Sequence, residues 1–251
     1  MEAPVTRVAL VTGGIGGIGT AICRRMAREG HRVVATYHPA EADQALAWQA
    51  AEREAGADVH IAPVDVSSFD SCRDLISKVS AELGPVDILV NGAGITRDKT
   101  LKKMDPEQWR AVLSTNLDSV FNVTKHVIDS MVDRGFGRVV NISSVNGQKG
   151  QFGQTNYSSA KAGMLGFTMS LAQEVATKGV TVNAISPGYI DTPMTAAMPD
   201  DIRNAIVAGI PLRRMGTPDD IANAVAFLIS GDSDYITGVN LPVNGGMFMS
   251  C

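Results

Sequence analysis

Long apolar stretches and clusters of basic residues are both missing from this 251-residue sequence. No stretch reaches the ~18 apolar residues of a membrane span, and no run of Lys or Arg exceeds two residues. A net charge of −4 without a basic patch argues against binding to nucleic acid or to a membrane surface. Residues 1–4 also lack the basic segment that opens a signal peptide. We therefore expect a cytoplasmic protein.

Cysteine and aromatic residues are scarce as well. The three cysteines, Cys23, Cys72 and Cys251, are scattered without metal-ligand spacing, and their odd number argues against a disulfide framework. Aromatic residues make up 5% of the chain, against 45% hydrophobic residues and 25 glycines, which is typical of packed helices and tight turns. The length suits one large α/β domain, so we expect residues 1–251 to form a single unit.

Apolar, β-branched stretches alternate with helical segments along the whole chain. The period of about 25 to 30 residues is typical of repeated βαβ units. This pattern predicts an α/β, Rossmann-like, doubly wound parallel sheet of about seven strands with helices on both faces. Strands are expected at 7–11, 32–36, 59–63, 86–90, 138–142, 180–185 and 236–243. Helices are expected at 17–28, 40–55, from a cap at 67 or 68 to 83, at 106–131, and around Tyr157 to about 177.

A glycine-rich loop, Thr12-Gly-Gly-Ile-Gly-Gly-Ile-Gly19, joins the first expected strand to the first helix. Glycines there allow positive φ and let backbone amides approach a phosphate at the positive end of the helix dipole. The loop therefore predicts a dinucleotide pyrophosphate site. The sequence of this loop fits two glycine motifs, G-x-G-x-x-G and T-G-x-x-x-G-x-G, and does not distinguish between them.

Tyr157 and Lys161 stand four residues apart in a segment expected to be helical, so both side chains rise from one face. An ammonium beside a phenol favours the phenolate, so we expect Lys161 to lower the pKa of Tyr157. Ser143 and Ser144 follow a strand at its carboxyl end, where open α/β sheets place ligands. Each feature alone is ordinary, since such pairs are often solvated and paired serines often form turns. The combination suggests proton transfer.

These motifs together resemble the short-chain dehydrogenase/reductase family over essentially the whole chain. Within it, the chain is most similar to the acetoacetyl-CoA reductases of polyhydroxybutyrate synthesis, through residues 94–98, 141–157 and 172–179. The 3-oxoacyl-carrier-protein reductases share the core motifs but less of the 141–157 loop. The motifs that carry the family resemblance are Thr12–Gly19, Asn91–Gly94, Thr115-Asn116-Leu117, Ser144, Tyr157-x-x-x-Lys161, and Pro187-Gly188 with Thr192.

The resemblance implies NAD(P)H-dependent reduction of a 3-oxoacyl thioester. Tyr157 would be the general acid, Ser144 would hydrogen-bond the carbonyl oxygen, and Lys161 would assist Tyr157 and bind the cofactor ribose. Asn116 would hold a water that passes protons to Lys161. The expected cofactor-binding residues are Gly13, Gly16, Gly17, Ile18, Gly19, His38, Asp65, Val66, Asn91, Gly92, Ala93, Gly94, Tyr157, Lys161, Pro187, Gly188, Ile190 and Thr192.

The resemblance also implies a site for acetoacetyl-CoA or another short 3-oxoacyl thioester. Its expected contacts are Asp98, Ser144, Gln151, Phe152, Gln154 and Tyr189, although each loop residue could serve packing alone. Residues 193–215 resemble a mobile lid, in which Met194, Met198 and Met215 could contact the acyl chain or form helix core. Family members usually form tetramers, so we expect a homotetramer.

The segment after the second strand departs from the resemblance. NAD enzymes place an acidic residue there and NADP enzymes a basic one. The sequence reads Thr36-Tyr-His-Pro-Ala-Glu41-Ala-Asp43, with no Arg or Lys between Arg32 and Arg53. It therefore favours NADH, while His38 offers a route by which NADPH could still be held.

Two other functions compete with the first. A carrier-protein reductase needs a basic docking patch, for which Lys102, Lys103, Arg134 and Arg138 are candidates. A nucleotide-sensing protein that had lost the chemistry would be expected to lack Ser144, Tyr157 or Lys161. All three are present, which disfavours that alternative.

Overall fold

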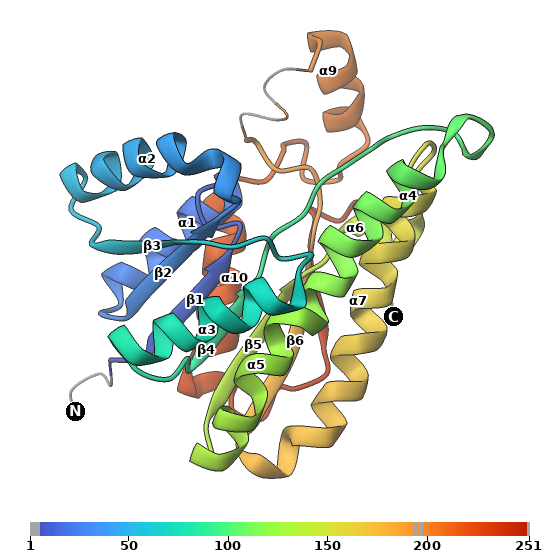
Figure 1. Ribbon diagram of the computed structural model, residues 1–251. Helices are drawn as coiled ribbons and strands as arrows, with labels where there is room; N and C mark the ends of the chain where they lie inside the picture. Colours follow the sequence, from blue (N-terminus) through green and yellow to red (C-terminus); the bar gives the residue numbers. More distant parts are fainter. Residues whose placement is uncertain (1–5, 193–194, 196–197, 250–251) are drawn as a thin grey trace.

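Seven parallel strands form the centre of the molecule (Figure 1). In the computed structural model, which describes residues 6–192, 195 and 198–249, they lie in the order β3-β2-β1-β4-β5-β6-β7, with every neighbouring pair parallel. This confirms the expected sheet. The strands are β1 (Val8–Thr12), β2 (Arg32–Tyr37), β3 (Val59–Pro63), β4 (Ile88–Asn91), β5 (Gly137–Ile142), β6 (Val180–Pro187) and β7 (Asn240–Val243).

Helices cover both faces of the sheet, as the sequence predicted (Figure 1). α1 and α10 lie on one face, and α3, α5 and α7 on the other. Within the described ranges, every helix is too short or too polar to cross a bilayer. The helices are α1 (Gly17–Arg28), α2 (Ala42–Glu54), α3 (Phe69–Leu83), α4 (Pro106–Leu113), α5 (Ser119–Arg134), α6 (Val145–Lys149), α7 (Thr155–Val175), α9 (Asp200–Ala208) and α10 (Pro218–Ile229).

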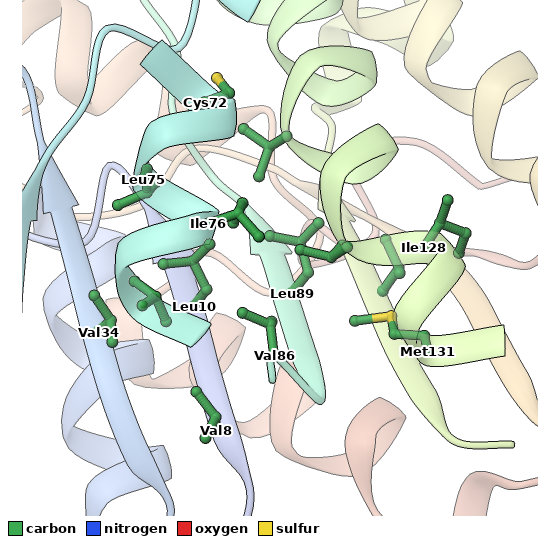
Figure 2. Close-up of a cluster of buried hydrophobic side chains, with 14 of the residues drawn as sticks. Val8, Leu10, Val34, Cys72, Leu75, Ile76, Val86, Leu89, Ile128 and Met131 are labelled. Atoms are coloured by element: carbon green, nitrogen blue, oxygen red, sulfur yellow. The ribbon is translucent and has the colours of Figure 1, made fainter. Parts of the chain in front are cut away.

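The strands are apolar throughout because both of their faces are buried. Successive side chains of a strand point to opposite faces, so Leu10 joins the core under α3 and α5, while Ala9 and Val11 join the core under α1 and α10. Figure 2 shows the first of these cores, with Ile76 and Met131 lying over the sheet. Burial on both sides fixes the register of each strand against its neighbours.

One expected element is confirmed with an irregularity inside it, and another is shorter than expected. The helix expected over 106–131 is α4 and α5 joined by a π-helical turn, η3 (Ser114–Asp118). The strand expected over 236–243 begins only at Asn240. Gly238 interrupts it with a φ of 76°, which an extended strand does not allow.

Three of the described helices were not expected from the sequence, and one of them, α9, lies within the expected lid. α6 lies in the segment read as a polar loop, and α10 follows the expected lid. α10 did have a start signal, because Thr217 and Asp220 form a capping box around Pro218. Its apolar face, including Ile221 and Val225, is buried against the sheet and α1.

The strand order places a reversal between β1 and β4, from which the chain winds in opposite directions. Ligands of open α/β sheets bind in the crevice that such a reversal opens at the carboxyl ends of the strands. Thr12, Asn91, Ile142 and Pro187 end β1, β4, β5 and β6 at this edge. The loops that follow these four residues therefore form the candidate site.

Candidate active site

The glycine loop after β1 forms a cradle that is too closely packed at Gly14 and Gly19 for a side chain. A Cβ on Gly14 would lie 2.6 Å from Ala35 Cα, and a Cβ on Gly19 would lie 2.2 Å from the Gly13 carbonyl oxygen. Gly16 caps α1 and Gly17 begins it, so the first amides of α1 have no intrahelical acceptor here. This cradle fits a pyrophosphate group. Ile18, another expected cofactor residue, packs partly buried against the core under α1.

Thr12 joins the glycine loop to the loop after β4. Its Oγ1 accepts hydrogen bonds from the amides of Gly92 and Ala93, at 3.0 and 3.1 Å. Gly92 also lies so close that a Cβ there would be 2.9 Å from the Thr12 carbonyl oxygen. The resemblance included Thr12, but the sequence did not show that its hydroxyl holds the 91–94 loop.

The side chain of Asn91 forms its hydrogen bonds below the carboxyl edge of the sheet rather than at the edge itself. Its side-chain Nδ2 donates to Thr124 Oγ1 at 3.1 Å and to Asn141 Oδ1 at 2.8 Å. Asn141 in turn donates to Thr168 Oγ1 of α7 at 2.9 Å. This buried ladder of hydrogen bonds ties α5, β4, β5 and α7 together directly beneath the site. Any contact of Asn91 with a cofactor would therefore come from its backbone.

The candidate adenosine contacts lie at the ends of β2 and β3. Asp65 Oδ1 accepts from the amide and the hydroxyl of Ser67, at 3.0 and 2.6 Å, and Val66 is buried beside it. His38 caps the short helix 39–41: its Nδ1 accepts from Ala40 N at 3.2 Å, and its amide donates to Glu41 Oε2 at 3.1 Å. The carboxylate of Glu41 is thus held at the end of β2.

α7 carries Tyr157 and Lys161 one turn apart, as the sequence predicted. Lys161 is only 4% exposed, and its Nζ donates to the carbonyl oxygen of Ile142 at 2.7 Å. Nζ also lies 5.7 Å from the centre of the Tyr157 ring. Ser144, at the end of β5, caps α6 by accepting from Asn146 N at 3.1 Å, and its hydroxyl also interacts with that of Tyr157. The three side chains therefore meet at the carboxyl edge of the sheet.

The pKa of Tyr157 moves in the opposite direction from the one expected. Burial raises it, the hydrogen bond with Ser144 lowers it, and the charge of Asp98 raises it further, for a net increase. Lys161 does not reverse this, because its ammonium points to the Ile142 carbonyl and burial lowers its own pKa from 10.5 to about 8. Near neutral pH, Tyr157 is therefore a protonated phenol, which is the form that donates a proton.

Asn116 lies in the π-helical turn η3 and is fully buried. Its Oδ1 accepts from the amide of Ile95 at 2.8 Å, and its Nδ2 donates to the carbonyl oxygen of Ile95 at 2.9 Å. The side chain thus fixes the loop that follows Gly94. Its expected role in holding a water stays a prediction.

The segment after β6 runs beside β7. Gly188 N donates to Val243 O at 3.0 Å, and a Cβ on Gly188 would lie 2.8 Å from Asn244 Cα. Ile190 is buried in the core, and the amide of Thr192 donates to Thr195 Oγ1 at 2.8 Å. A cavity of about 500 Å³ opens here, lined by Tyr189 and parts of 210–220 and 242–249, but not by Ser144, Tyr157 or Lys161.

Two of the residues expected to contact the substrate, Asp98 and Gln154, form a hydrogen bond with each other. Gln154 Nε2 donates to Asp98 Oδ2 at 2.7 Å, and Gln154 Oε1 accepts from Asn146 Nδ2 at 2.9 Å. Asn146 was not among the expected site residues, although it follows Ser144 by two positions. Gln151 accepts from Lys149, and Phe152 is 87% exposed. The structure therefore groups Asp98 and Gln154 near Ser144, with Phe152 on the outside.

The described part of the expected lid contains α9, which stands away from the sheet in Figure 1. Met215 is buried, which favours the alternative that it forms core, whereas Met198 is partly exposed. Met194 lies outside the described residues. Closure of residues 193–215 over a substrate stays a prediction.

The four basic residues considered for a carrier-protein patch do not come together. Arg138 is buried at the amino end of β5, paired with Asp234, and Arg134 pairs there with Asp87. Lys102 and Lys103 lie exposed in the loop after β4, beyond the opposite ends of the strands. Arg134 and Arg138 are held in these ion pairs, at the end of the sheet opposite to Lys102 and Lys103.

Comparison with known proteins shows similarity from the glycine loop to β7. A family model described as enoyl-(acyl carrier protein) reductase matches residues 13–248. The chain is 62% identical over 245 residues to an acetoacetyl-CoA reductase of Allochromatium vinosum, covering 98% of this chain and 100% of that protein. An acetoacetyl-CoA reductase of Cupriavidus necator is 55% identical over 243 residues, covering 97% and 98%. A 3-oxoacyl-acyl-carrier-protein reductase of Escherichia coli is 46% identical over 243 residues, with the same coverage.

Burial of Lys161 predicts a specific dependence of stability on pH. Its pKa is about 8 in the folded protein and about 10.4 in an unfolded chain. Between these values the unfolded state binds more protons, so the free energy of unfolding rises with pH. From pH 7 to 10.5, wild type should gain about 3 kcal/mol relative to Lys161→Met. Urea denaturation at fixed protein concentration measures this difference.

The matched control for this experiment is Lys125→Met, which removes an exposed lysine of α5. Its curve should stay parallel to that of wild type across the same pH range. Parallel curves for wild type and Lys161→Met would show instead that Lys161 does not titrate in this window.

Proposed function

This chain belongs to the short-chain dehydrogenase/reductase family, and on that premise we propose that it reduces acetoacetyl-CoA to (R)-3-hydroxybutyryl-CoA. One observation carries the proposal: Ser144, Tyr157 and Lys161 come together at the carboxyl edge of the sheet, the edge that also carries the glycine cradle. Relatives named as acetoacetyl-CoA reductases support the substrate. The product would be a precursor for polyhydroxybutyrate, and the expected cytoplasmic location stays a prediction.

The glycine cradle and the first amides of α1 would hold the pyrophosphate of a nicotinamide cofactor. Asp65 would accept from the adenine amino group, and residues 187–192 would lie against the nicotinamide. Lys161 would donate to the ribose hydroxyls next to it. Bound in this way, the cofactor supplies the hydride that adds to the 3-keto carbon of the substrate.

The protein's own residues would manage the proton. As the keto oxygen gains negative charge, Tyr157 donates its phenolic proton to that oxygen, and Ser144 donates a hydrogen bond to the same atom. The raised pKa of Tyr157 keeps the phenol protonated until this step. Lys161 and a water at Asn116 would then return a proton to the tyrosinate. General acid catalysis of this kind contributes roughly 10²–10⁴-fold.

Acetoacetyl-CoA reduction tests the proposal directly. With reduced cofactor present, the loss of nicotinamide absorbance should follow the addition of acetoacetyl-CoA, with (R)-3-hydroxybutyryl-CoA as the product. Catalytic efficiency with the CoA thioester should exceed that with the carrier-protein thioester, because Arg134 and Arg138 are unavailable for docking. A preference for the carrier-bound substrate would favour the competing fatty-acid-synthesis function.

Tyr157→Phe serves as the control variant for this assay. Loss of the phenolic hydroxyl should lower turnover about 10²-fold or more, while cofactor affinity stays near that of wild type. Unchanged turnover would end the assignment of Tyr157 as the acid.

We also propose that NADH is preferred over NADPH. The capping contacts hold the Glu41 carboxylate beside the end of β2, where a 2′-phosphate would be repelled. His38 could donate to a phosphate through Nε2. Its Nδ1 is already used in the cap, where it accepts from Ala40 N.

The cofactor preference predicts the effect of a charge change at Glu41. Wild type should show the higher kcat/KM with NADH, and Glu41→Gln should raise kcat/KM with NADPH about fivefold, since one close surface charge pair contributes about 1 kcal/mol. Glu54→Gln, at the other end of α2, should leave both values unchanged. A tenfold wild-type preference for NADPH would contradict the proposal.

The proposed assembly is a homotetramer. Apolar side chains are exposed along α4, α5 and the segments beside them, including Leu101, Trp109 and Phe121, and Phe121 stacks on Phe69. On α7, a Cβ on Gly166 would meet no neighbour, whereas one on Gly163 would press on Leu117. An exposed apolar surface of this kind is typical of a subunit interface.

Sedimentation equilibrium should therefore give the mass of a tetramer. Phe121→Glu should dissociate it, because the charge would be buried in the interface. Leu46→Glu, at an exposed leucine of α2, should leave the mass unchanged. A monomeric wild type would contradict the proposal.

A further inference from the structure

Three contacts from one short segment converge on Lys161. The carbonyl oxygen of Ile142 accepts from the ammonium at 2.7 Å, and the hydroxyl of Ser143 donates to the backbone carbonyl oxygen of Lys161 at 2.8 Å. A Cβ on Gly147 would lie 2.8 Å from the carbonyl carbon of Lys161. The end of β5 and the start of α6 thus enclose both the backbone and the side chain of this residue.

Ser143 is held from two sides. It is 3% exposed, its amide donates to the carbonyl oxygen of Ile185 in β6 at 2.7 Å, and its hydroxyl reaches α7. A serine hydroxyl has one proton to donate, and here that proton goes to Lys161. Ser143 therefore cannot share the role of Ser144 toward a substrate oxygen. It is a fixed link between the sheet and the helix.

Gly147 determines how closely α6 approaches α7. An added Cβ would meet Lys161 C at 2.8 Å, Lys161 Cβ at 2.9 Å and Ala162 N at 3.0 Å. Two of these three atoms belong to the backbone of α7, so a side chain at position 147 requires one helix to move. Gly147 lies within α6 with no positive φ, so close packing is the reason for glycine at this position.

Small movements of Lys161 have large consequences for the reaction. Tyr157 lies one turn earlier on the same helix, so both side chains move together. The ammonium of Lys161 is buried, and the Ile142 carbonyl is the acceptor it reaches. A misplacement of about 1 Å in a catalytic group can cost about 10²-fold in rate.

We propose that Ser143 and Gly147 are positioning residues that set where α7 presents Lys161 and Tyr157 to the cofactor and the substrate. Ser143 fixes the Lys161 backbone through its hydroxyl, and Gly147 permits the close contact that completes the enclosure. This inference rests on the proposed function, in which Lys161 binds the cofactor ribose and Tyr157 donates the proton.

Ser143→Ala tests the hydroxyl. Turnover with acetoacetyl-CoA should fall about tenfold or more, while KM for the thioester stays within about twofold of wild type, because Ser143 does not touch the substrate. NADH affinity, measured by nicotinamide fluorescence, should fall about fivefold as the ammonium loses its place beside the ribose. The matched control is Ser233→Ala, which removes a buried hydroxyl that donates to the Ser230 carbonyl, away from the site.

Two more variants separate positioning from stability. Ser143→Thr keeps the hydroxyl and should restore turnover and NADH affinity. Gly147→Ala keeps Ser143 but displaces α7, and should lower both values even if Ser143→Ala does not fold. Equal behaviour of Ser143→Ala and Ser233→Ala would overturn the inference. So would a Ser143→Thr variant that melts like wild type but is as impaired as Ser143→Ala.

The inference and the proposed function fail in different ways. A wild type that binds NADH but does not reduce acetoacetyl-CoA would contradict the proposed function alone, since the NADH affinities of the four variants would still decide the role of Ser143 and Gly147. A wild type that reduces acetoacetyl-CoA, with Ser143→Ala and Gly147→Ala equally active, would contradict the inference alone.

Discussion

The burial of one ammonium group constrains this whole site. Lys161 is almost entirely removed from water, which is costly for a charge unless a partner is fixed nearby. The partner is the carbonyl oxygen of Ile142, the last residue of β5. The end of β5 and the start of α7 must therefore lie side by side at the carboxyl edge of the sheet. The contacts of Ser143, Gly147 and Asn141 with α7 hold them in that position.

The loops that would bind the cofactor depend on the same arrangement. Thr12 holds the loop after β4 from one side, and Asn116 holds Ile95 just beyond it. Beneath them, the ladder from Thr124 through Asn91 and Asn141 to Thr168 connects both helices to the sheet. Polar side chains in a buried network have few alternative partners. A preformed site at this edge is the result.

Much of this structure could be read from the sequence, because strand and helix periodicity are local signals. The alternation of strands and helices predicted the parallel sheet but not its strand order, and Tyr157 and Lys161 needed only a helical spacing. The direction of the Tyr157 pKa shift could not be read, since it depends on burial and on Asp98, distant in the chain. The hydrogen bond between Asp98 and Gln154 and the ion pair between Arg138 and Asp234 could not be predicted either, because such contacts depend on the tertiary fold.

The π-helical turn at 114–118 gives the chain between α4 and α5 one residue more than a regular helix would use. Each residue of an α-helix turns the chain by about 100°. The wider π-helical turn absorbs the extra residue, so α5 keeps the phase that buries Val123 and Val127 in the core. The turn thus makes room for one added residue in the segment that carries Asn116, without displacing the helix that follows.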